Sequence, residues 1–314
     1  MNSGKKIYIA GHRGLVGSAI WRHLQTSGFT NLIGLTSNEV DLRDREKTIK
    51  TLSSLQPDIV IIAAAKVGGI GANFSQPVAF LNDNQKIQAN ILEASHLINV
   101  ERLLFLGSSC IYPKFAPQPI KEEYLLTGGL EETNISYAIA KISGLINVKA
   151  YRSQYKHNWI SAMPTNLYGP NDNYDLQNSH VLPALIRKFH EAKETQKPFV
   201  ELWGDGSPMR EFLHVDDLAK ACIFLLNEYH DSLHINIGTG VEISIQNLAH
   251  LIAKKVGFAG DIKWDTSKPN GTPRKILDSS RINNLGWKSE INLDKGIEST
   301  YIDFKSSIFT SQLF

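Results

Sequence analysis

The sequence predicts an α/β protein built on a doubly wound parallel sheet, with a smaller α/β domain after it. Three observations predict this class. Short apolar segments alternate with helix-like, periodic segments through the first half of the chain. The strand-like segments are apolar throughout, as in parallel strands that are covered on both faces. The second half has long loops rich in Gly, Pro, Asn and Asp between its helices, and such loops are where substrate contacts usually lie.

The elements of the first half follow from periodicity and from the residues that end each segment. Gly28 ends the first helix and Gln56-Pro57 the second, while Pro77 suits the first turn of the third. The expected strands are 6–10, 31–36, 58–65 and 102–109, and the expected helices between them are 15–28, 45–55 and 77–100. Further on, helices are expected at 136–157, 181–195, 216–229 and 244–257, and loops at 164–180, 203–212 and 268–275.

Composition excludes several classes of protein. The 314 residues suffice for one large or two small domains, and 42% apolar with 20% charged residues is ordinary for a globular protein. A net charge of +2 without a basic run predicts no nucleic-acid partner. Apolar runs such as 59–65 are far shorter than the ~20 residues of a membrane helix, and no signal core opens the chain. Two cysteines, Cys110 and Cys222, form no disulfide framework. We therefore expect a cytoplasmic protein without a membrane or metal site.

A glycine-rich loop follows the first strand. Gly11, Gly14 and Gly17 are spaced G-x-x-G-x-x-G, directly before a helix. Such glycines permit a tight turn and let a pyrophosphate approach the positive end of the helix. The position between strand and helix favours dinucleotide binding over an ordinary turn. The sequence thus predicts a Rossmann-type cofactor domain at 1–167, with a return segment near 212–238, and a substrate domain over the rest of 168–314.

The residues after the second strand bear on the choice between NAD and NADP. An acid there would bind the ribose 2′-hydroxyl, whereas a base would bind a 2′-phosphate. The chain has Thr36, Ser37 and Asn38 at this point and Arg13 in the glycine loop. This favours NADP(H), and Glu39 is the one residue that would reverse the preference. Asp41 and Leu42 suit either a contact with the adenine edge or, for Asp41, a helix N-cap.

Proton-handling groups cluster in two further segments. Tyr137 and Lys141 are four residues apart on one helical face, where an ammonium is expected to lower the phenol pKa for acid–base work. The fourth strand ends in Ser108, Ser109 and Cys110, at the ligand edge of a doubly wound sheet. Together with the glycine loop, this order of motifs is typical of short-chain dehydrogenases.

Over almost its whole length the chain resembles the GDP-L-fucose synthase family of extended short-chain dehydrogenases/reductases. Members of that family are also called GDP-4-keto-6-deoxy-D-mannose 3,5-epimerase-4-reductases. The resemblance rests on "AGHRGLVGSAI" (10–20), "AAAKVGGI" (63–70), "LGSSCIYPK" (106–114), "YAIAKI" (137–142), "MPTNLYGP" (163–170), "NSHVLPALIRKFHEA" (178–192), "PMREFLHVDD" (208–217) and "GTPRKILD" (271–278).

The resemblance implies a bifunctional enzyme that uses NADPH on a GDP-sugar with a ketone at C4. Protons on C3 and C5 are acidic because they are α to that carbonyl. By resemblance, Cys110 is the base and His180 the acid on the opposite face. Ser108 and Tyr137 hold the enolate oxygen, and Tyr137 later supplies a proton as hydride reaches C4. Lys141 supports Tyr137 and holds the nicotinamide ribose.

The resemblance also implies binding residues and one departure. The expected cofactor contacts are Gly11, His12, Arg13, Gly14, Leu15, Val16, Gly17, Ser37, Asn38, Asp41, Leu42, Leu106, Gly107, Ser109, Lys141, Pro164, Thr165, Asn166, Leu167 and His180. The expected substrate contacts are Lys188, Trp203, Arg210 and Asp278, with Arg187 adjacent. An arginine often stands in the family where this chain has Ser37, so half of the expected 2′-phosphate clamp is absent.

Several residues have plainer interpretations. Cys222 is expected in the core, and His180 is otherwise simply the start of a helix that Asn178 or Ser179 caps. His214 is expected to orient a loop, with Asp216 as helix cap.

Three rival functions make different demands on the same residues. A 4,6-dehydratase of this scaffold looks for Thr-Asp-Glu at the strand tip, a 4-epimerase needs neither Cys110 nor His180, and a non-catalytic regulator tends to lose Tyr137 or Lys141. Another nucleotide-sugar epimerase/reductase of the extended group is the alternative. As is usual in the family, a homodimer is expected through helices 77–100 and 136–157.

Overall fold

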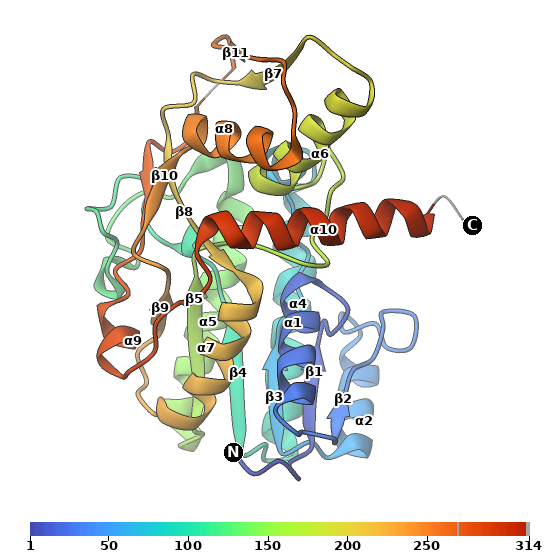
Figure 1. Ribbon diagram of the computed structural model, residues 1–314. Helices are drawn as coiled ribbons and strands as arrows, with labels where there is room; N and C mark the ends of the chain where they lie inside the picture. Colours follow the sequence, from blue (N-terminus) through green and yellow to red (C-terminus); the bar gives the residue numbers. More distant parts are fainter. Residues whose placement is uncertain (269, 312–314) are drawn as a thin grey trace.

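Six parallel strands form the central sheet of the computed structural model, which describes residues 1–268 and 270–311 (Figure 1). Their order in space is β2-β1-β3-β4-β5-β9, and every pairing along this path is parallel. The expected α/β fold with a doubly wound sheet is confirmed. The strands are β1 (Ile7–Ala10), β2 (Leu32–Ile33), β3 (Ile59–Ile62), β4 (Arg102–Leu106), β5 (Trp159–Pro164) and β9 (Ile235–Ile237).

Helices cover both faces of this sheet, which explains why its strands are apolar throughout. Along β3, Ile59 and Ile61 join one core cluster, whereas Val60 and Ile62 join another on the opposite face. The first cluster lies against α1 (Leu15–Thr26) and α7 (Val215–Glu228). The second lies against α2 (Arg45–Leu55), α4 (Pro77–Leu97) and α5 (Ile135–Tyr155).

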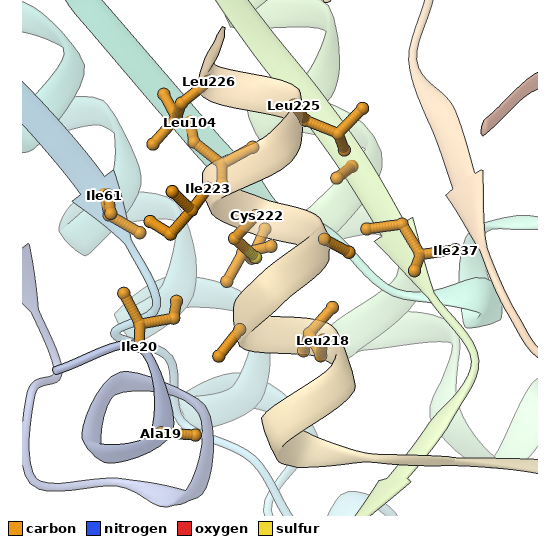
Figure 2. Close-up of a cluster of buried hydrophobic side chains, with 14 of the residues drawn as sticks. Ala19, Ile20, Ile61, Leu104, Leu218, Cys222, Ile223, Leu225, Leu226 and Ile237 are labelled. Atoms are coloured by element: carbon orange, nitrogen blue, oxygen red, sulfur yellow. The ribbon is translucent and has the colours of Figure 1, made fainter. Parts of the chain in front are cut away.

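The expected core position of Cys222 is confirmed. Figure 2 shows its side chain on α7, among apolar side chains from the sheet and from α1. Cys222 has no exposed surface, and burial raises the pKa of its thiol. The thiol therefore packs as a small apolar group.

A second core lies at the end of the molecule beyond the carboxyl ends of the strands. Figure 1 shows α10 (Leu293–Ser311) crossing between the central sheet and the pair α6 (Val181–Glu194) and α8 (Ile245–Val256). These helices pack with β8 (Met209–His214) and β7 (Phe199–Trp203) around Phe189, Phe212 and Phe304. The remaining elements are α3 (Ile70–Ser75), α9 (Ser280–Asn284), β6 (Asn166–Tyr168), β10 (Glu242–Ser244), β11 (Asp261–Asp265), β12 (Arg274–Lys275) and 3₁₀ turns at Ser109–Ile111, Glu122–Tyr124 and Glu132–Asn134.

The chain returns to the central sheet after it has left it. After β8, helix α7 packs beside α1, and β9 then pairs with β5 at the edge of the sheet. The return segment near 212–238 covers these elements, while the division into domains at residue 167 stays a prediction.

Two local expectations are wrong. The strand expected at 31–36 is only Leu32–Ile33, because the chain turns at 36–40, where the Glu39 and Val40 amides bond to the Thr36 carbonyl. His214, not Asp216, caps α7: its Nδ1 accepts the Asp216 N–H at 3.2 Å. Asp216 instead accepts a hydrogen bond from Arg22 at 2.8 Å.

No helix within residues 1–268 and 270–311 has both the length and the apolar character that crossing a bilayer requires.

Candidate active site

The glycine loop between β1 and α1 is shaped by close backbone approaches. Gly11 has φ +84°, and a Cβ there would lie 2.8 Å from the Ala64 backbone. A Cβ on Gly17 would lie 2.1 Å from the Gly11 carbonyl oxygen. Gly14 is the N-cap of α1. Because glycine has no side chain, the first N–H groups of the helix face the loop without a side-chain hydrogen bond. This cradle fits a pyrophosphate, which prefers a helix N-terminus.

The one acidic residue at the tip of β2, Glu39, is already hydrogen-bonded within its own turn. The Glu39 carboxylate accepts hydrogen bonds from the Thr36 N–H and hydroxyl, both at 2.7 Å, and the Thr36 amide bond is the main cause that lowers its pKa. Arg13 is exposed and close enough for its charge to lower that pKa further. Ser37 and Asn38 are exposed beside it. The tip thus offers a cation and hydroxyl or amide groups, with Glu39 held by its own turn.

His12 and Arg13 are fixed from two sides. The His12 ring lies 5.6 Å from the Trp21 ring, and its Nδ1 is buried without a hydrogen-bond partner among the described residues. Asn171, at φ +70°, donates from its side chain to the Arg13 carbonyl at 2.7 Å. The loop after β6 therefore holds the glycine loop, a contact that the sequence did not predict.

The N-cap expected at Asp41 is wrong. Asp44 caps α2 by accepting the Lys47 N–H at 3.1 Å. Asp41 instead accepts from the Arg43 side chain and backbone, and chiefly the guanidinium lowers its pKa to about 2. The Leu42 carbonyl accepts from Asn90 at 2.9 Å. The adenine-edge role of Asp41 and Leu42 stays a prediction.

The end of β4 places Cys110 in a short 3₁₀ turn. Leu106 and Gly107 are buried, and a Cβ on Gly107 would lie 2.2 Å from the Met163 sulfur. The Ser108 hydroxyl caps the turn by accepting the Cys110 N–H at 3.3 Å. Cys110 is only 6% exposed and Ser109 only 3%. The turn therefore holds Ser108 and Cys110 together at the carboxyl end of the strand.

The Tyr137–Lys141 pair lies on α5 beside that turn. The Lys141 ammonium lies 5.7 Å from the centroid of the Tyr137 ring. It donates a hydrogen bond to the Leu106 carbonyl at 2.8 Å, which ties α5 to the end of β4. Charge on Cys110 acts on both residues, raising the pKa of each. The helix thus brings the phenol, the ammonium and the thiol into one site.

The expected lowering of the Tyr137 pKa is wrong for the protein alone. Burial raises the pKa of its phenol above the ordinary value, and Cys110 adds to the effect. The Lys141 ammonium is bonded to a carbonyl instead of the phenol, and burial lowers the Lys141 pKa to about 8. A raised phenol pKa keeps Tyr137 protonated, which is the form that a proton donor needs.

His180 is the N-cap residue of α6 and makes no side-chain cap. Its side chain is exposed, while the surrounding protein and then the charge of Lys275 lower the imidazole pKa. Neither alternative cap is used: Asn178 donates to Asp175, and the Ser179 hydroxyl is buried without a partner among the described residues. The side chain of His180 therefore does not cap the helix and remains available for another role.

The segment 164–167 lines the next strand end. Pro164 ends β5, and Asn166 and Leu167 lie in β6, which pairs with β8. The Asn166 side chain donates to the Glu211 carbonyl at 2.8 Å, and the Thr165 hydroxyl donates to the same oxygen at 3.3 Å. These bonds fix the segment beside the end of β4, with which β5 pairs.

The four expected substrate residues lie on different elements. Lys188 is half-buried on α6, and Arg210 is half-buried on β8, where burial lowers its pKa. Trp203 ends β7 with 68% of its surface exposed. Asp278 follows β12, but its carboxylate accepts the Ser280 N–H at 2.8 Å, and it does not line the cavity described next.

A cavity opens beside Cys110, and the sequence did not predict several of its residues. It is lined by Cys110, Tyr112, Pro113, Lys114, Ile120, Glu131, Asn134, Thr272, Arg274 and Lys275. Glu131 forms an ion pair with Lys114 at 3.0 Å. Lys275 stands in the segment "GTPRKILD", but only Asp278 was singled out there. The sequence carries no local signal for Lys275, because it lies in a two-residue strand that only its pairing with β8 defines.

Comparison with known proteins identifies the class. Residues 7–238 match the model of the NAD dependent epimerase/dehydratase family. The chain belongs to this family, an enzyme family whose nicotinamide cofactor fits the glycine cradle described above.

Within that class the chain is similar to GDP-L-fucose synthases, as the resemblance implied. It is 56% identical to GDP-L-fucose synthase 1 of Arabidopsis thaliana over 94% of this chain and 92% of the relative. It is 50% identical to GDP-L-fucose synthase of Escherichia coli K12, over 95% and 96% of the two chains. A solved structure of a GDP-mannoheptose C4 reductase from Campylobacter jejuni with NADP bound is 40% identical, with a TM-score of 0.91 over 97% and 99% of the chains.

Proposed function

We propose that this chain converts GDP-4-keto-6-deoxy-D-mannose to GDP-L-fucose by inverting C3 and C5 and then reducing C4 with NADPH. The observation that carries the proposal is the shared site of Cys110 with Tyr137 and Lys141. A thiol suited to removing a proton from carbon lies beside a phenol suited to protonating an oxygen. Reduction alone would need only the second group.

The epimerase half begins at Cys110. Its thiolate takes a proton from C3 or C5, forming an S–H bond while the C–H electron pair moves into an enolate. Ser108 and Tyr137 donate hydrogen bonds to the enolate oxygen, as preorganised donors do in other sites. His180 returns a proton to the opposite face of the same carbon. Each cycle leaves that centre inverted, and the thiol and imidazole then exchange protons with water.

The reductase half depends on α5. A bound nicotinamide supplies a hydride to C4 when the cofactor occupies the glycine cradle. Tyr137 gives its phenolic proton to the C4 oxygen, and Lys141 stabilises the phenolate that remains. Gly11, Gly14 and Gly17 would hold the pyrophosphate, and Asn166 and Leu167 would line the nicotinamide pocket.

We infer NADP(H) instead of NAD(H) from the tip of β2. Arg13 is available to a 2′-phosphate, and the Glu39 carboxylate is bonded to Thr36. The relative from Campylobacter jejuni was solved with NADP bound, which supports the same choice.

The GDP part of the substrate is assigned to the second core. Lys188 and Arg210 supply cations for the diphosphate, and the exposed Trp203 packs on the base or sugar. Asp278 remains a candidate for a substrate hydroxyl.

Two further assignments concern the whole protein. The thiols of Cys110 and Cys222 are free, and a thiol base must stay reduced, so we infer a cytoplasmic location. A homodimer through α4 and α5 is supported by exposed apolar residues along α5, namely Ile135, Ile139 and Ile146.

The test is incubation with GDP-4-keto-6-deoxy-D-mannose and NADPH, with the configuration of the product determined by NMR. GDP-L-fucose is expected. A product reduced at C4 with C3 and C5 unchanged would contradict the proposal. That outcome would favour the alternative of another nucleotide-sugar reductase on this fold, as the similarity to a GDP-mannoheptose C4 reductase suggests.

A further inference from the structure

The proposed base has a buried thiol, and burial opposes the charge that it needs. Only 6% of Cys110 is exposed, and burial is the main cause that raises the pKa of its thiol. A thiol takes a proton from carbon only as the thiolate. The site must therefore supply positive charge or hydrogen bonds to the sulfur.

The charges of two lysines, Lys141 and Lys275, act on Cys110. Lys141 already has a hydrogen-bond partner. Lys141 donates to the Leu106 carbonyl at 2.8 Å and lies over the Phe105 ring at 5.1 Å. Its position is thus set by the end of β4 and by Tyr137. The ammonium of Lys275 has no hydrogen-bond acceptor and no ion-pair partner in the described part of the chain.

The strand β12 places both of its residues, Arg274 and Lys275, on the cavity that Cys110 lines. The guanidinium of Arg274 is occupied by an ion pair with Glu242, at 2.7 and 2.8 Å. Lys275 pairs with Arg210 in the sheet register and lines the cavity that Cys110 also lines.

The charged groups around this cavity shift one another's pKa values. The Lys275 charge acts on Cys110 and on His180, lowering the pKa of both, after the larger effect of burial. Burial lowers the pKa of Lys275 itself, Cys110 and Glu131 raise it, and Arg210 lowers it. Lys114 is paired with Glu131. Lys275 is thus a cation whose charge affects both the proposed base and the proposed acid.

We propose that Lys275, which lines the same cavity as Cys110, offsets part of the cost of burying the Cys110 thiolate and thereby acts as a positioning residue for proton removal from C3 and C5. This inference rests on the proposed function only in assigning proton removal from C3 and C5 to the thiolate. The same charge favours the neutral imidazole of His180, so a protonated His180 is a stronger acid. When Cys110 accepts the proton from carbon, its negative charge passes to the enolate, and Lys275 remains charged throughout.

The test measures the thiol without any substrate. The rate of Cys110 alkylation by iodoacetamide is followed against pH, with Cys110→Ser to subtract reaction at Cys222. The unchanged protein supplies the reference profile, in which burial raises the pKa of the thiol despite the lysine charges. The proposal concerns how far that pKa rises further when the Lys275 charge is removed.

Variants then assign the effect to one charge. Lys275→Met should reduce the alkylation rate at pH 7 by about tenfold, as a rise of about one pKa unit requires. Lys275→Arg keeps the charge and should stay within about threefold of the unchanged protein. Lys263→Met, at an exposed position on β11 that does not line this cavity, is the matched control and should leave the pH profile in place. An unchanged profile in Lys275→Met would overturn the proposal.

Deuterium exchange at C3 and C5 in D₂O separates this inference from the proposed function. If Lys275→Met shifts the thiol profile but even the unchanged protein exchanges neither proton, the proposed function fails and the charge effect stands. If the unchanged protein exchanges both protons and Lys275→Met exchanges them equally fast with an unchanged thiol profile, the inference fails and the proposed function stands.

Discussion

Single side chains in the site serve different steps of the proposed reaction, although they lie together. The charge of Cys110 adds to burial in raising the pKa of the Tyr137 phenol. The Ser108 hydroxyl caps the turn that carries the thiol. Because one group serves proton removal from carbon and the other serves reduction, single substitutions should separate the two activities.

Tyr137→Phe should abolish reduction while leaving NADPH binding nearly intact. The substitution removes the proton donor for the C4 oxygen but leaves the glycine loop unchanged. Loss of a general acid costs about 10²–10⁴-fold in rate. NADPH oxidation measures turnover, and fluorescence titration measures cofactor binding. Turnover close to that of the unchanged protein would contradict the role of Tyr137.

Cys110→Ser should lose exchange of the C3 and C5 protons, because a serine hydroxyl is a far weaker base at neutral pH. Tyr137, Lys141 and the cofactor site are unaltered, so slow reduction of the unepimerised ketone is expected. Deuterium incorporation without NADPH, read by NMR, isolates the first half-reaction. His180→Gln should retain some proton removal yet fail to complete inversion. Exchange of both protons at the original rate in Cys110→Ser would make the thiol a packing residue.

Ser37→Arg should increase the preference for NADP(H) over NAD(H). The exposed Ser37 lies at the tip of β2 beside Arg13, and a second cation there would bind the 2′-phosphate. The measured quantity is the ratio of kcat/KM for the two cofactors, and Ser53→Arg, which adds the same charge at an exposed position on α2, is the control. If the ratio does not change, the phosphate does not lie near residue 37.

At the scale of elements, the end of one helix depends on a buried arginine from the sheet. Arg102 of β4 donates to the Leu225, Leu226 and Tyr229 carbonyls at the carboxyl end of α7, at 2.8–3.2 Å. It also donates to the Asn158 carbonyl at 2.9 Å. Cations stabilise this end of a helix because the last carbonyls lack partners. Burial lowers the Arg102 pKa to about 10, which leaves the guanidinium charged at neutral pH.

Arg102→Met should lower the free energy of unfolding by about 3 kcal/mol, because several buried carbonyls lose a charged donor. Urea denaturation followed by circular dichroism measures the change. Arg45→Met, which breaks an exposed ion pair with Glu93, is the control and should cost less than about 1 kcal/mol. Equal losses in the two variants would show that the bonds of Arg102 contribute no more than surface charge.

The elements that sequence reasoning found are those whose signal is local. The helix predicted at 45–55 is α2 to the residue, because the chain stops it at Gln56-Pro57. The strand β9 was missed because it has only three residues, and β5 because its segment includes Ser161 and ends in Pro164; pairing with distant neighbours defines both strands. One missed element carried a usable pattern, because α10 spaces Ile297, Tyr301 and Phe304 on one face. The strand β7 carried none, since its exposed residues include the apolar Phe199 and Trp203.

The residues of the site also divide into those that the sequence indicates locally and those that only the structure shows. Motifs and resemblance located the glycine loop, Cys110, Tyr137 and Lys141, because their order in the chain is informative. Lys275 and Asn171 were not predicted, since their importance arises from contacts over long sequence separations. Asn171 meets the Arg13 carbonyl 158 residues away. The direction in which the Tyr137 pKa shifts could also be found only from the structure. Burial of the phenol raises this pKa, although the spacing of Tyr137 and Lys141 predicted a lower one.

At the scale of the whole molecule, the cofactor cradle and the second core are joined at the carboxyl edge of the sheet. Asn171 donates to Arg13 in the glycine loop, and its own N–H donates to Asp303 on α10 at 2.9 Å. The substrate candidates Lys188 and Arg210 belong to elements that pack with α10 or beside it. The two halves of the proposed site are therefore held in one arrangement by direct bonds.

The homodimer is tested by charging the exposed apolar stripe of α5. Ile139 and Ile146 are 40% and 44% exposed, and both lie on the helix that packs against α4. A stable interface buries about 800 Å² on each partner, and a glutamate inside it would lose hydration without a partner. The double variant Ile139→Glu, Ile146→Glu should therefore sediment as a monomer at concentrations where the unchanged protein is a dimer. Ile302→Glu, an equally apolar and 56% exposed position on α10, should leave the dimer intact. A double variant that sediments like the unchanged dimer would place the interface elsewhere on the molecule.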